Sequence, residues 1–459
     1  MRLHFRPFLP FSWLCLLLFS VSLLHAENRL LPIGVAKIDI TPDYPVRLSG
    51  YGVRTTEYEG IDLRLWAKAM AFGDEDSGIS VLVTVDNTGV PGTITEAVFK
   101  TLAEQTPLKR ENFVVASTHT HAAPMLNGVL PFLFSADIPP EHQERIDRYT
   151  EELTENLIEV SLAALADRQP AFLAWTEGEV RFAKNRRETD GPVDHSLPIL
   201  TVHSPEGKLR GVLANYACHC TTLQYNRIHG DWAGVAQKLI EENHPGSIAM
   251  ISIGAGGDAN PSPRGTLDLV QQHGKELADE VARLLQEPLT PISQIPSGSR
   301  KSLELPFASL PTREEWTARS QETGIIGYHA KKNLERLDRG ESLPETLSYT
   351  VQEWHFGNDL AMVFLPGEVV SDYALRLKSE FSRLWVTAYA NDVPCYIPSE
   401  RVLSKSDGAY RYEGWFSMHF YDRPTGFAPG IEEKIIGAVH SVVPSTYQET
   451  KIPMLKNRP

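Results

Sequence analysis

The stretch FVVASTHTH, residues 113–121, joins a short apolar run to a cluster of hydroxyl and imidazole side chains. Val114 and Val115 are β-branched, and an unbroken apolar run of this length is typical of a strand covered on both faces. His119 and His121 are two residues apart, so in an extended segment both rings lie on one face. The stretch therefore predicts a buried strand that ends in a loop able to bind a metal or a substrate.

Five further apolar runs have the same form, and each ends in a polar or glycine-rich cluster. They span 79–85, 211–217, 248–253, 360–365 and 384–390, and the clusters begin at Asp86, Cys218, Gly254, Pro366 and Asn391. Helical patterns alternate with them, over 95–104, 143–167, 232–243, 266–286, 370–381 and 431–442. Turn residues follow most strands, but six endings that carry His, Asp and Glu favour one shared site.

This alternation predicts the fold class. We expect an α/β protein with a mixed β-sheet core, helices packed on the sheets, and strand-end loops that form a site. The segment 288–302 is rich in Pro and Ser and is the best candidate for a linker. Because candidate site residues lie on both sides of it, we interpret it as an internal loop of one catalytic domain over residues 27–459.

The N-terminus has the order of a secretory signal peptide. Arg2 and Arg6 precede an apolar run over 8–24, and Ala26 precedes a polar segment. We expect cleavage after Ala26, with an uncleaved anchor as the alternative, and a secreted or periplasmic protein. No later segment is apolar enough to span a membrane, so the mature chain is expected to have no transmembrane span.

The net charge argues against a nucleic-acid-binding protein, and the cysteine content argues against a disulfide scaffold. The formal net charge is −14 without a basic stripe, so nucleic-acid binding is not expected. Cys15 lies in the predicted signal peptide, and the remaining Cys218, Cys220 and Cys395 are too few and odd in number for a disulfide scaffold. Nothing in the sequence indicates the oligomeric state.

His219 is the second anchor of the predicted site. It follows a strand, and Thr221-Thr222 supply hydroxyls that can orient a ligand. Zinc prefers neutral imidazole and carboxylate ligands, and histidines directly after strands favour function over a structural role. In an extended segment Cys218 and Cys220 face away from His219, so we expect small buried residues there rather than ligands.

The glycine-rich segment 254–258 has neither a dinucleotide fingerprint nor a P-loop, because no Lys-Ser/Thr pair follows it. Glycines allow the backbone to approach a substrate closely, and backbone N–H groups can stabilise a developing oxyanion. By itself this signal is weak.

Taken together, the motifs resemble the neutral (alkaline, non-lysosomal) ceramidases over most of the mature chain. The motifs are GVAKIDITP (34–42), LSGYG (48–52), ASTHTHAAP (116–124), NRR (185–187), NYACHCTT (215–222), GDWAG (230–234), GAGGDANP (254–261), PGE (366–368) and the segment 389–414. Each match is weak alone, but their order and spacing are specific.

The resemblance implies one catalytic zinc ion, with four ligands: His119, His219, Glu368 and Tyr396. It places His121 beside the metal as a proton donor or oxyanion stabiliser, Tyr412 against the reacting carbonyl, and Arg186 on the substrate. The expected substrate-binding residues are Asn185, Gly256, Gly257 and Asp258. Zinc chemistry suits this set, because it activates water and polarises a carbonyl.

Two departures from the family pattern stand out. Family members read Gly-Asp-x-Ser-Pro where this chain has Asn260, which cannot act as a nucleophile although its amide could bind an oxyanion. Water activated by zinc does not need that serine. The ceramidases continue into a C-terminal immunoglobulin-like domain, and this domain is expected to be missing after the segment 431–442.

The sequence therefore predicts an exported zinc amidohydrolase of N-acylated, lipid-like substrates. The alternatives are a zinc esterase of the same fold and a catalytically silent binding protein marked by Asn260. If His219 and Tyr396 share one zinc ion, Cys395 comes near Cys218 and Cys220, so a disulfide is conceivable; three buried thiols are the alternative.

Overall fold

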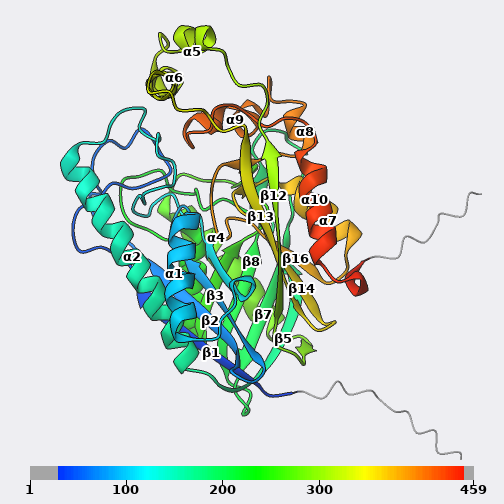
Figure 1. Ribbon diagram of the computed structural model, residues 1–459. Helices are drawn as coiled ribbons and strands as arrows, with labels where there is room; N and C mark the ends of the chain where they lie inside the picture. The colour runs from blue at the N-terminus through cyan, green and yellow to red at the C-terminus, as the bar shows by residue number, and fades with distance from the viewer. Residues whose placement is uncertain (1–28, 449–459) are drawn as a thin grey trace, which may run out of the picture.

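The strand that begins at Phe113 forms one edge of a nine-stranded sheet in the computed structural model, which describes residues 29–448 (Figure 1). Along the sheet the strands are β4 (Phe113–Ser117), β3 (Gly78–Val85), β2 (Trp66–Asp74), β1 (Leu31–Asp39), β5 (Gln169–Glu179), β7 (Ser196–His203), β8 (Leu209–Tyr216) and β9 (Ile248–Ile253), and β11 (Thr290–Ile292) pairs with β5. The predicted mixed sheet is confirmed, since β4 runs parallel to β3 and β9 parallel to β8, while the other pairs are antiparallel.

The loops after β4 and β8 meet beyond the carboxyl ends of these strands. Thr120 and Cys220 form an isolated parallel bridge, and the N–H of His121 donates to the carbonyl of Cys220 at 3.3 Å. Two histidine segments about a hundred residues apart in the sequence are therefore joined through their backbones.

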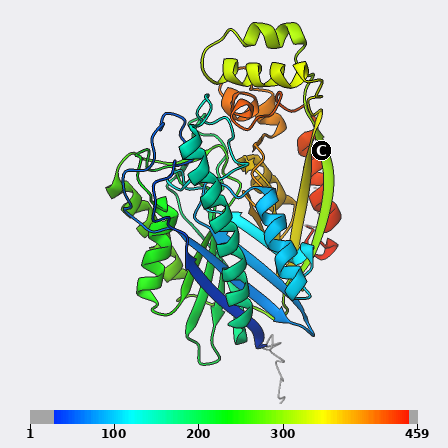
Figure 2. The same ribbon diagram turned by 60° about the vertical axis from the view of Figure 1, so that its left-hand side comes forward.

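Helices pack on one face of this sheet, in keeping with the predicted helices packed on the sheets. α1 (Gly92–Gln105) and the long α2 (Pro140–Ala166) pack on β1–β4, as Figure 2 shows, and share an apolar cluster with them. α3 (Asp231–Asn243) and α4 (Leu267–Leu284) pack on the other half of the sheet. The opposite faces of both halves enclose a core that includes Met70, Leu213 and Met250.

A second sheet of four strands closes this core. It consists of β12 (Ser297–Pro306), β13 (Thr346–Phe356), β14 (Leu360–Phe364) and β16 (Leu384–Thr387). Trp354, Phe364 and Trp385 reach into the core that it shares with the first sheet. α7 (Ser371–Glu380) and α10 (Ile431–Val442) pack on the second sheet, and α5 (Arg313–Arg319) and α6 (Gly324–Asp338) stand at its far end (Figures 1 and 2).

The prediction of a loop over 288–302 is wrong. The segment contains β11 and the first half of β12, which pair with β5 and β13. Most side chains of these strands are exposed or half-buried, so no apolar pattern marks them in the sequence. The segment connects the two sheets, and both sheets supply residues to the site described below.

The three cysteines of the described residues are free and buried, so the hypothesis of a bridge from Cys395 is not kept and the alternative of buried thiols holds. Cys218 and Cys220 pack in the apolar core, with His219 turned the other way, as the alternation predicted. Within residues 29–448, no helix is long and apolar enough to cross a membrane. The predicted signal peptide lies outside the described residues.

We expect Ile251→Ala to destabilise the fold by about 2–5 kcal/mol, because Ile251 is fully buried on β9 against the helix-covered face and its removal leaves a cavity. The free energy of unfolding in urea measures the effect. The matched control is Val53→Ala, in a side chain that is 89% exposed, with an expected change below about 0.5 kcal/mol. Equal effects of both variants would contradict the assigned core.

Candidate metal centre

His119 lies in the loop directly after β4, in a left-handed backbone conformation with φ of 57°. The expectation that an extended segment turns both rings to one face is therefore wrong for this residue. The side chains of His119 and His121 converge nevertheless, with 3.1 Å between their Nε2 atoms. The unusual backbone turn, stabilised by stacking of the His119 ring on Tyr389 at 4.2 Å, brings them together.

Two backbone carbonyls fix the tautomers of His119 and His219. The Nδ1 of His119 lies 2.6 Å from the carbonyl oxygen of Thr88, and the Nδ1 of His219 lies 3.0 Å from that of Gly256. Since a carbonyl can only accept, each Nδ1 carries the hydrogen and each neutral ring presents a bare Nε2. This is the orientation of histidines that bind metals.

Glu368 and Tyr396 enter from the second half of the chain. They lie opposite each other on the parallel pair β15 (Glu368–Val369) and β17 (Tyr396–Ile397). Glu368 Oε2 lies 3.2 Å from His119 Nε2 and 3.0 Å from His219 Nε2, and Tyr396 Oη lies 3.2 Å from His219 Nε2. All four side chains are buried.

These separations fit a metal ion. Bare nitrogens and a carboxylate oxygen that face one another without a hydrogen between them repel, unless a cation lies among them. With bonds of about 2.0 Å, the edges of a coordination tetrahedron measure about 3.3 Å. His121 belongs to the same group, because one ligand atom each from His119, His121 and His219 lies within 4.8 Å of the others. The buried cluster can therefore hold a metal.

His121 differs from the other two histidines in its contacts. Its Nδ1 is buried and has no hydrogen-bond partner among the described residues. Gly50, with φ of 95°, lies so close that a Cβ there would come within 2.4 Å of the His121 ring. Arg54 donates to the carbonyl of His121 at 2.6 Å, and Tyr51 contacts the ring edge-on. The ring is thus held by packing, with one nitrogen toward the centre.

Arg186 reaches the centre from the segment that follows β6 (Ala183–Asn185). It donates to Tyr396 Oη at 3.0 Å and to the buried carboxylate of Glu413 at 2.7 Å. Asn185 does not point at the centre: it accepts from the N–H groups of Arg187 and Glu188 and donates to Asp258 at 2.9 Å. Asn185 therefore shapes the turn that presents Arg186.

Tyr412 lies beside the centre on α9 (Arg411–Gly414), with its ring 5.5 Å from that of Tyr396. The guanidinium of Arg186 lies over both rings at 5.4 Å. Asn260 lies on β10 (Ala259–Pro261), partly exposed, where Thr221 donates to its side-chain oxygen at 3.5 Å. The sequence-predicted residues Arg186 and Tyr412 are thus brought together with the histidines.

The glycine-rich segment positions two residues of the centre. The carbonyl of Gly256 orients His219, and the N–H of Gly257 already donates to the carbonyl of Val369 at 2.8 Å. A Cβ on Gly257 would meet the backbone of Glu368 at 2.6 Å. The fully buried Asp258 accepts from the N–H and hydroxyl of Ser371, both at 2.8 Å. Gly257 and Asp258 therefore hold β15 in place.

Three residues of the centre were not predicted from the sequence. Tyr421 donates a short hydrogen bond to Glu368 Oε1, Tyr389 lies 3.5 Å from Glu368 Oε2, and Thr88 supplies the carbonyl for His119. Tyr389 ends an apolar run and could have been noticed there, whereas no pattern marks Tyr421. Conversely, Asp86 and Asp392 end predicted strands but accept from backbone N–H groups elsewhere.

Burial sets the protonation states around the centre. It lowers the pKa of His219 to about 4 and the pKa of His121 well below its ordinary value, so both imidazoles are neutral at neutral pH. Burial, reinforced by Glu368, raises the pKa of Tyr412 to about 12, so its hydroxyl keeps its proton. A neutral histidine is a metal ligand and a protonated tyrosine is a donor.

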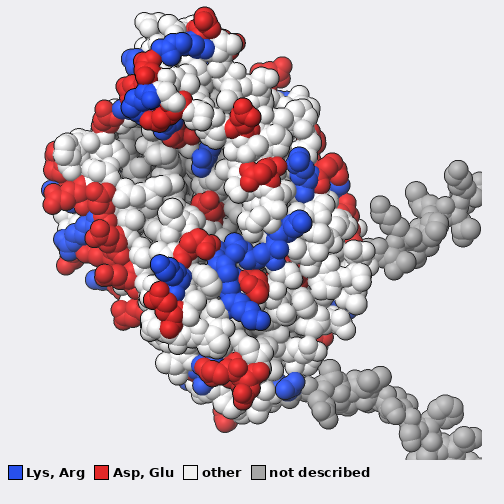
Figure 3. All heavy atoms as spheres, viewed as in Figure 1, with Lys and Arg blue, Asp and Glu red and all other residues white. Residues whose placement is uncertain are grey.

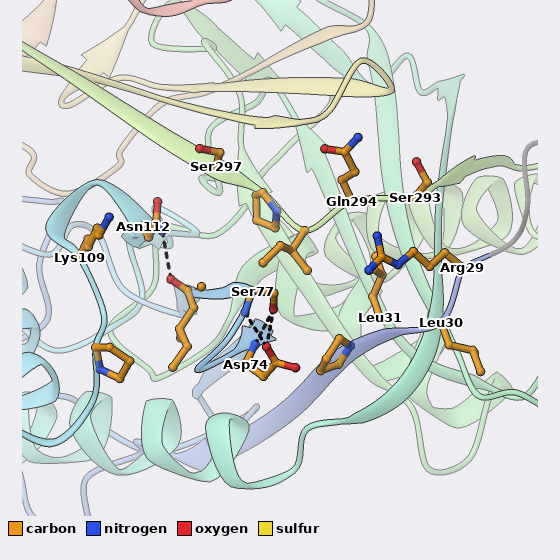
Figure 4. A pocket seen from close by; sticks show the side chains of 16 residues that line it. Arg29, Leu30, Leu31, Asp74, Ser77, Lys109, Asn112, Ser293, Gln294 and Ser297 are labelled. Atoms are coloured by element: carbon orange, nitrogen blue, oxygen red, sulfur yellow. Dashed lines mark hydrogen bonds between the residues drawn. The ribbon is translucent and has the colours of Figure 1, made fainter.

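A separate surface hollow lies at the opposite end of the sheet. Its volume is about 1240 Å³, and Figure 4 shows Asp74, Ser77, Lys109, Asn112 and Gln294 among the residues that line it. These residues lie near the starts of β3 and β4, whereas the metal centre lies beyond the ends of these strands. The hollow therefore shares no residue with the centre.

Comparisons with known proteins show which folds are similar to this one. The structure is similar to neutral ceramidase from Pseudomonas aeruginosa, with a TM-score of 0.66 and 17% identity over 89% of this chain and 75% of that chain. It is also similar to a ceramidase complexed with C2, with a TM-score of 0.69 and 16% identity over 89% and 74%. The comparison with curated sequences gave no match. The family model of neutral/alkaline non-lysosomal ceramidases, N-terminal part, matches residues 31–267, more than half of the chain, which therefore belongs to this family.

Proposed function

We propose that the protein is a zinc-dependent amidohydrolase that cleaves the amide bond of N-acylated, lipid-like substrates. The observation that carries this proposal is the convergence of two tautomer-fixed imidazoles, Glu368 and Tyr396 on one point. In this assignment His119, His219, Glu368 and Tyr396 hold the zinc ion, and family membership supports a ceramidase-like reaction. Two nitrogen and two oxygen ligands suit zinc.

When bound, zinc supplies a Lewis acid that activates water and polarises the substrate carbonyl. Cleavage of an amide also requires a proton donor, because the amide nitrogen is a poor leaving group until it is protonated. His121 is suited to move that proton: its Nδ1 has no hydrogen-bond partner within residues 29–448, and its Nε2 faces the centre 3.1 Å from His119. His119 and His219 are not free in this way, since carbonyls hold their Nδ1 hydrogens.

Other side chains hold the substrate. Tyr412 keeps its proton and has no hydrogen-bond partner for its hydroxyl among the described residues, so it can donate to the substrate carbonyl. Arg186 places a fixed positive charge beside the centre, and the amide of Asn260 can bind a developing oxyanion. Phe416 and Phe420 flank Tyr412 at 6.2 and 6.4 Å and offer an apolar wall to an acyl chain.

The same proposal includes export. A basic start, an apolar run and Ala26 precede β1, and the described residues contain no helix that could span a membrane. We expect expression in a Gram-negative host to give a mature chain that begins at Glu27, measured by intact mass. A chain that retains residues 1–26 and is found in the membrane fraction would contradict cleavage.

His219→Ala is expected to lower the zinc content from about one ion per chain to well below half, and to abolish hydrolysis of N-acyl amides, because one ligand is lost. Metal analysis and a panel of N-acyl amides, with matched esters to identify a plain esterase, test this. The control is His244→Ala, which removes a histidine at the far end of α3. Zinc that stays bound without activity would move His219 out of the ligand set, and a wild type that holds zinc but cleaves no amide would refute the proposal.

His121→Gln is expected to keep zinc but to lower kcat by about 10²–10⁴-fold, because the side chain can no longer carry a proton to the leaving nitrogen. The loss should be smaller for an ester whose leaving group needs no proton. Steady-state kinetics on an amide and an ester with the same acyl chain measure this difference. Loss of zinc in this variant would instead place His121 in the ligand set.

A further inference from the structure

Arg187 is a charged residue near the centre that the proposed chemistry does not use. Its Nε donates to both carboxylate oxygens of Glu413, at 2.8 and 2.9 Å, and its side chain is 27% exposed. Among residues 29–448, no hydrogen-bond partner occupies either of its Nη groups. The outer edge of this guanidinium is thus held in position and open to solvent.

The charged side chains around Arg187 are paired with one another, and Arg401 also pairs with Asp372 and Asp258. Glu413 is fully buried and also accepts from Arg186, so one carboxylate faces two guanidinium groups. The nearby Glu188 is already paired with Arg401 and Lys405. The chain as a whole has a net charge of −14, and acidic side chains gather over α2 in Figure 3. Among the described residues, Arg187 keeps one edge of its guanidinium without an acidic partner.

The position of Arg187 sets its distance from the reacting bond. Its guanidinium lies over the ring of Tyr412, 5.5 Å from the centroid, and that ring lies 5.5 Å from the ring of Tyr396. A group bound to Arg187 therefore lies several atoms away from an amide held at the metal centre. Because an acyl chain is apolar, a charged group at this distance belongs to the amine part of the substrate.

We propose that Arg187 binds an anionic group, a phosphate or a carboxylate, carried on the amine part of the N-acyl substrate. The guanidinium fork matches such a group with two parallel hydrogen bonds. This inference rests on the proposed amidase function and narrows its substrate class to N-acyl amines that carry an anionic group. Glu413 is the positioning residue, since it fixes the Nε side of the fork and leaves the other edge free.

The test compares N-dodecanoyl ethanolamine with its O-phosphate, which share acyl chain and amide. The zinc-loaded wild type is expected to prefer the phosphate by at least about tenfold in kcat/KM, mainly through KM. Arg187→Gln should bring this ratio close to one, and Arg187→Lys should restore part of it. Arg181→Gln, with the same change of charge on a side chain that is 69% exposed, should keep the ratio. If Arg187 has only a structural role, Arg187→Gln should change kcat/KM by the same factor for both substrates.

Binding to the zinc-stripped protein, measured by calorimetry with the same pair of amphiphiles, separates the two proposals. Hydrolysis without preference, or a preference that survives Arg187→Gln, overturns the anion site and leaves the amidase intact. Arg187-dependent binding of the phosphate without hydrolysis by the zinc-loaded protein supports the anion site and refutes the amidase. If the protein shows neither hydrolysis nor selective binding of the phosphate, both proposals are overturned.

Discussion

Two hydrogen bonds from imidazole Nδ1 atoms to backbone carbonyls determine what the centre can do. They join His119 to Thr88 and His219 to Gly256, and they leave both Nε2 atoms bare and facing Glu368. Either ring, rotated by half a turn, would present a hydrogen instead of a lone pair. Burial adds to this constraint, since a low-dielectric environment disfavours the protonated imidazole. The metal-binding character therefore depends on the loops after β3 and β9 as much as on the histidines.

The two sheets contribute different parts of the centre. The histidines follow β4 and β8 of the large sheet, whereas Glu368 and Tyr396 lie on the short pair that follows the second sheet. Gly257 joins these parts, because its N–H bonds to β15 and its missing side chain lets the backbone of Glu368 approach. Close packing between the sheets thus controls distances within the centre, and no single segment can form it alone.

A layer of arginine and carboxylate surrounds the cluster that can hold a metal. Glu413 is buried without solvent contact and is matched by Arg186 and Arg187, which avoids the large cost of an unpaired buried charge. Arg186 is turned toward Tyr396 and Arg187 toward the exterior, so one carboxylate orients a charge at the centre and a second charge at its rim. The two positions suit different parts of one substrate.

The sequence by itself determined the strands that are unbroken apolar runs, such as β3, β4, β8 and β9, and the long amphipathic helices α1 to α4, because apolar periodicity is a local property of the chain. It also marked His119, His219, Glu368 and Tyr396 as one set through the ordered family motifs. Only the tertiary structure decided the left-handed turn at His119, the internal role of Gly257 and the contact of Tyr421 with Glu368. These depend on hydrogen-bond partners and packing neighbours from distant segments, which no local pattern encodes. The strands within 288–302 were missed for a related reason, since their pairing partners, not their own composition, make them strands.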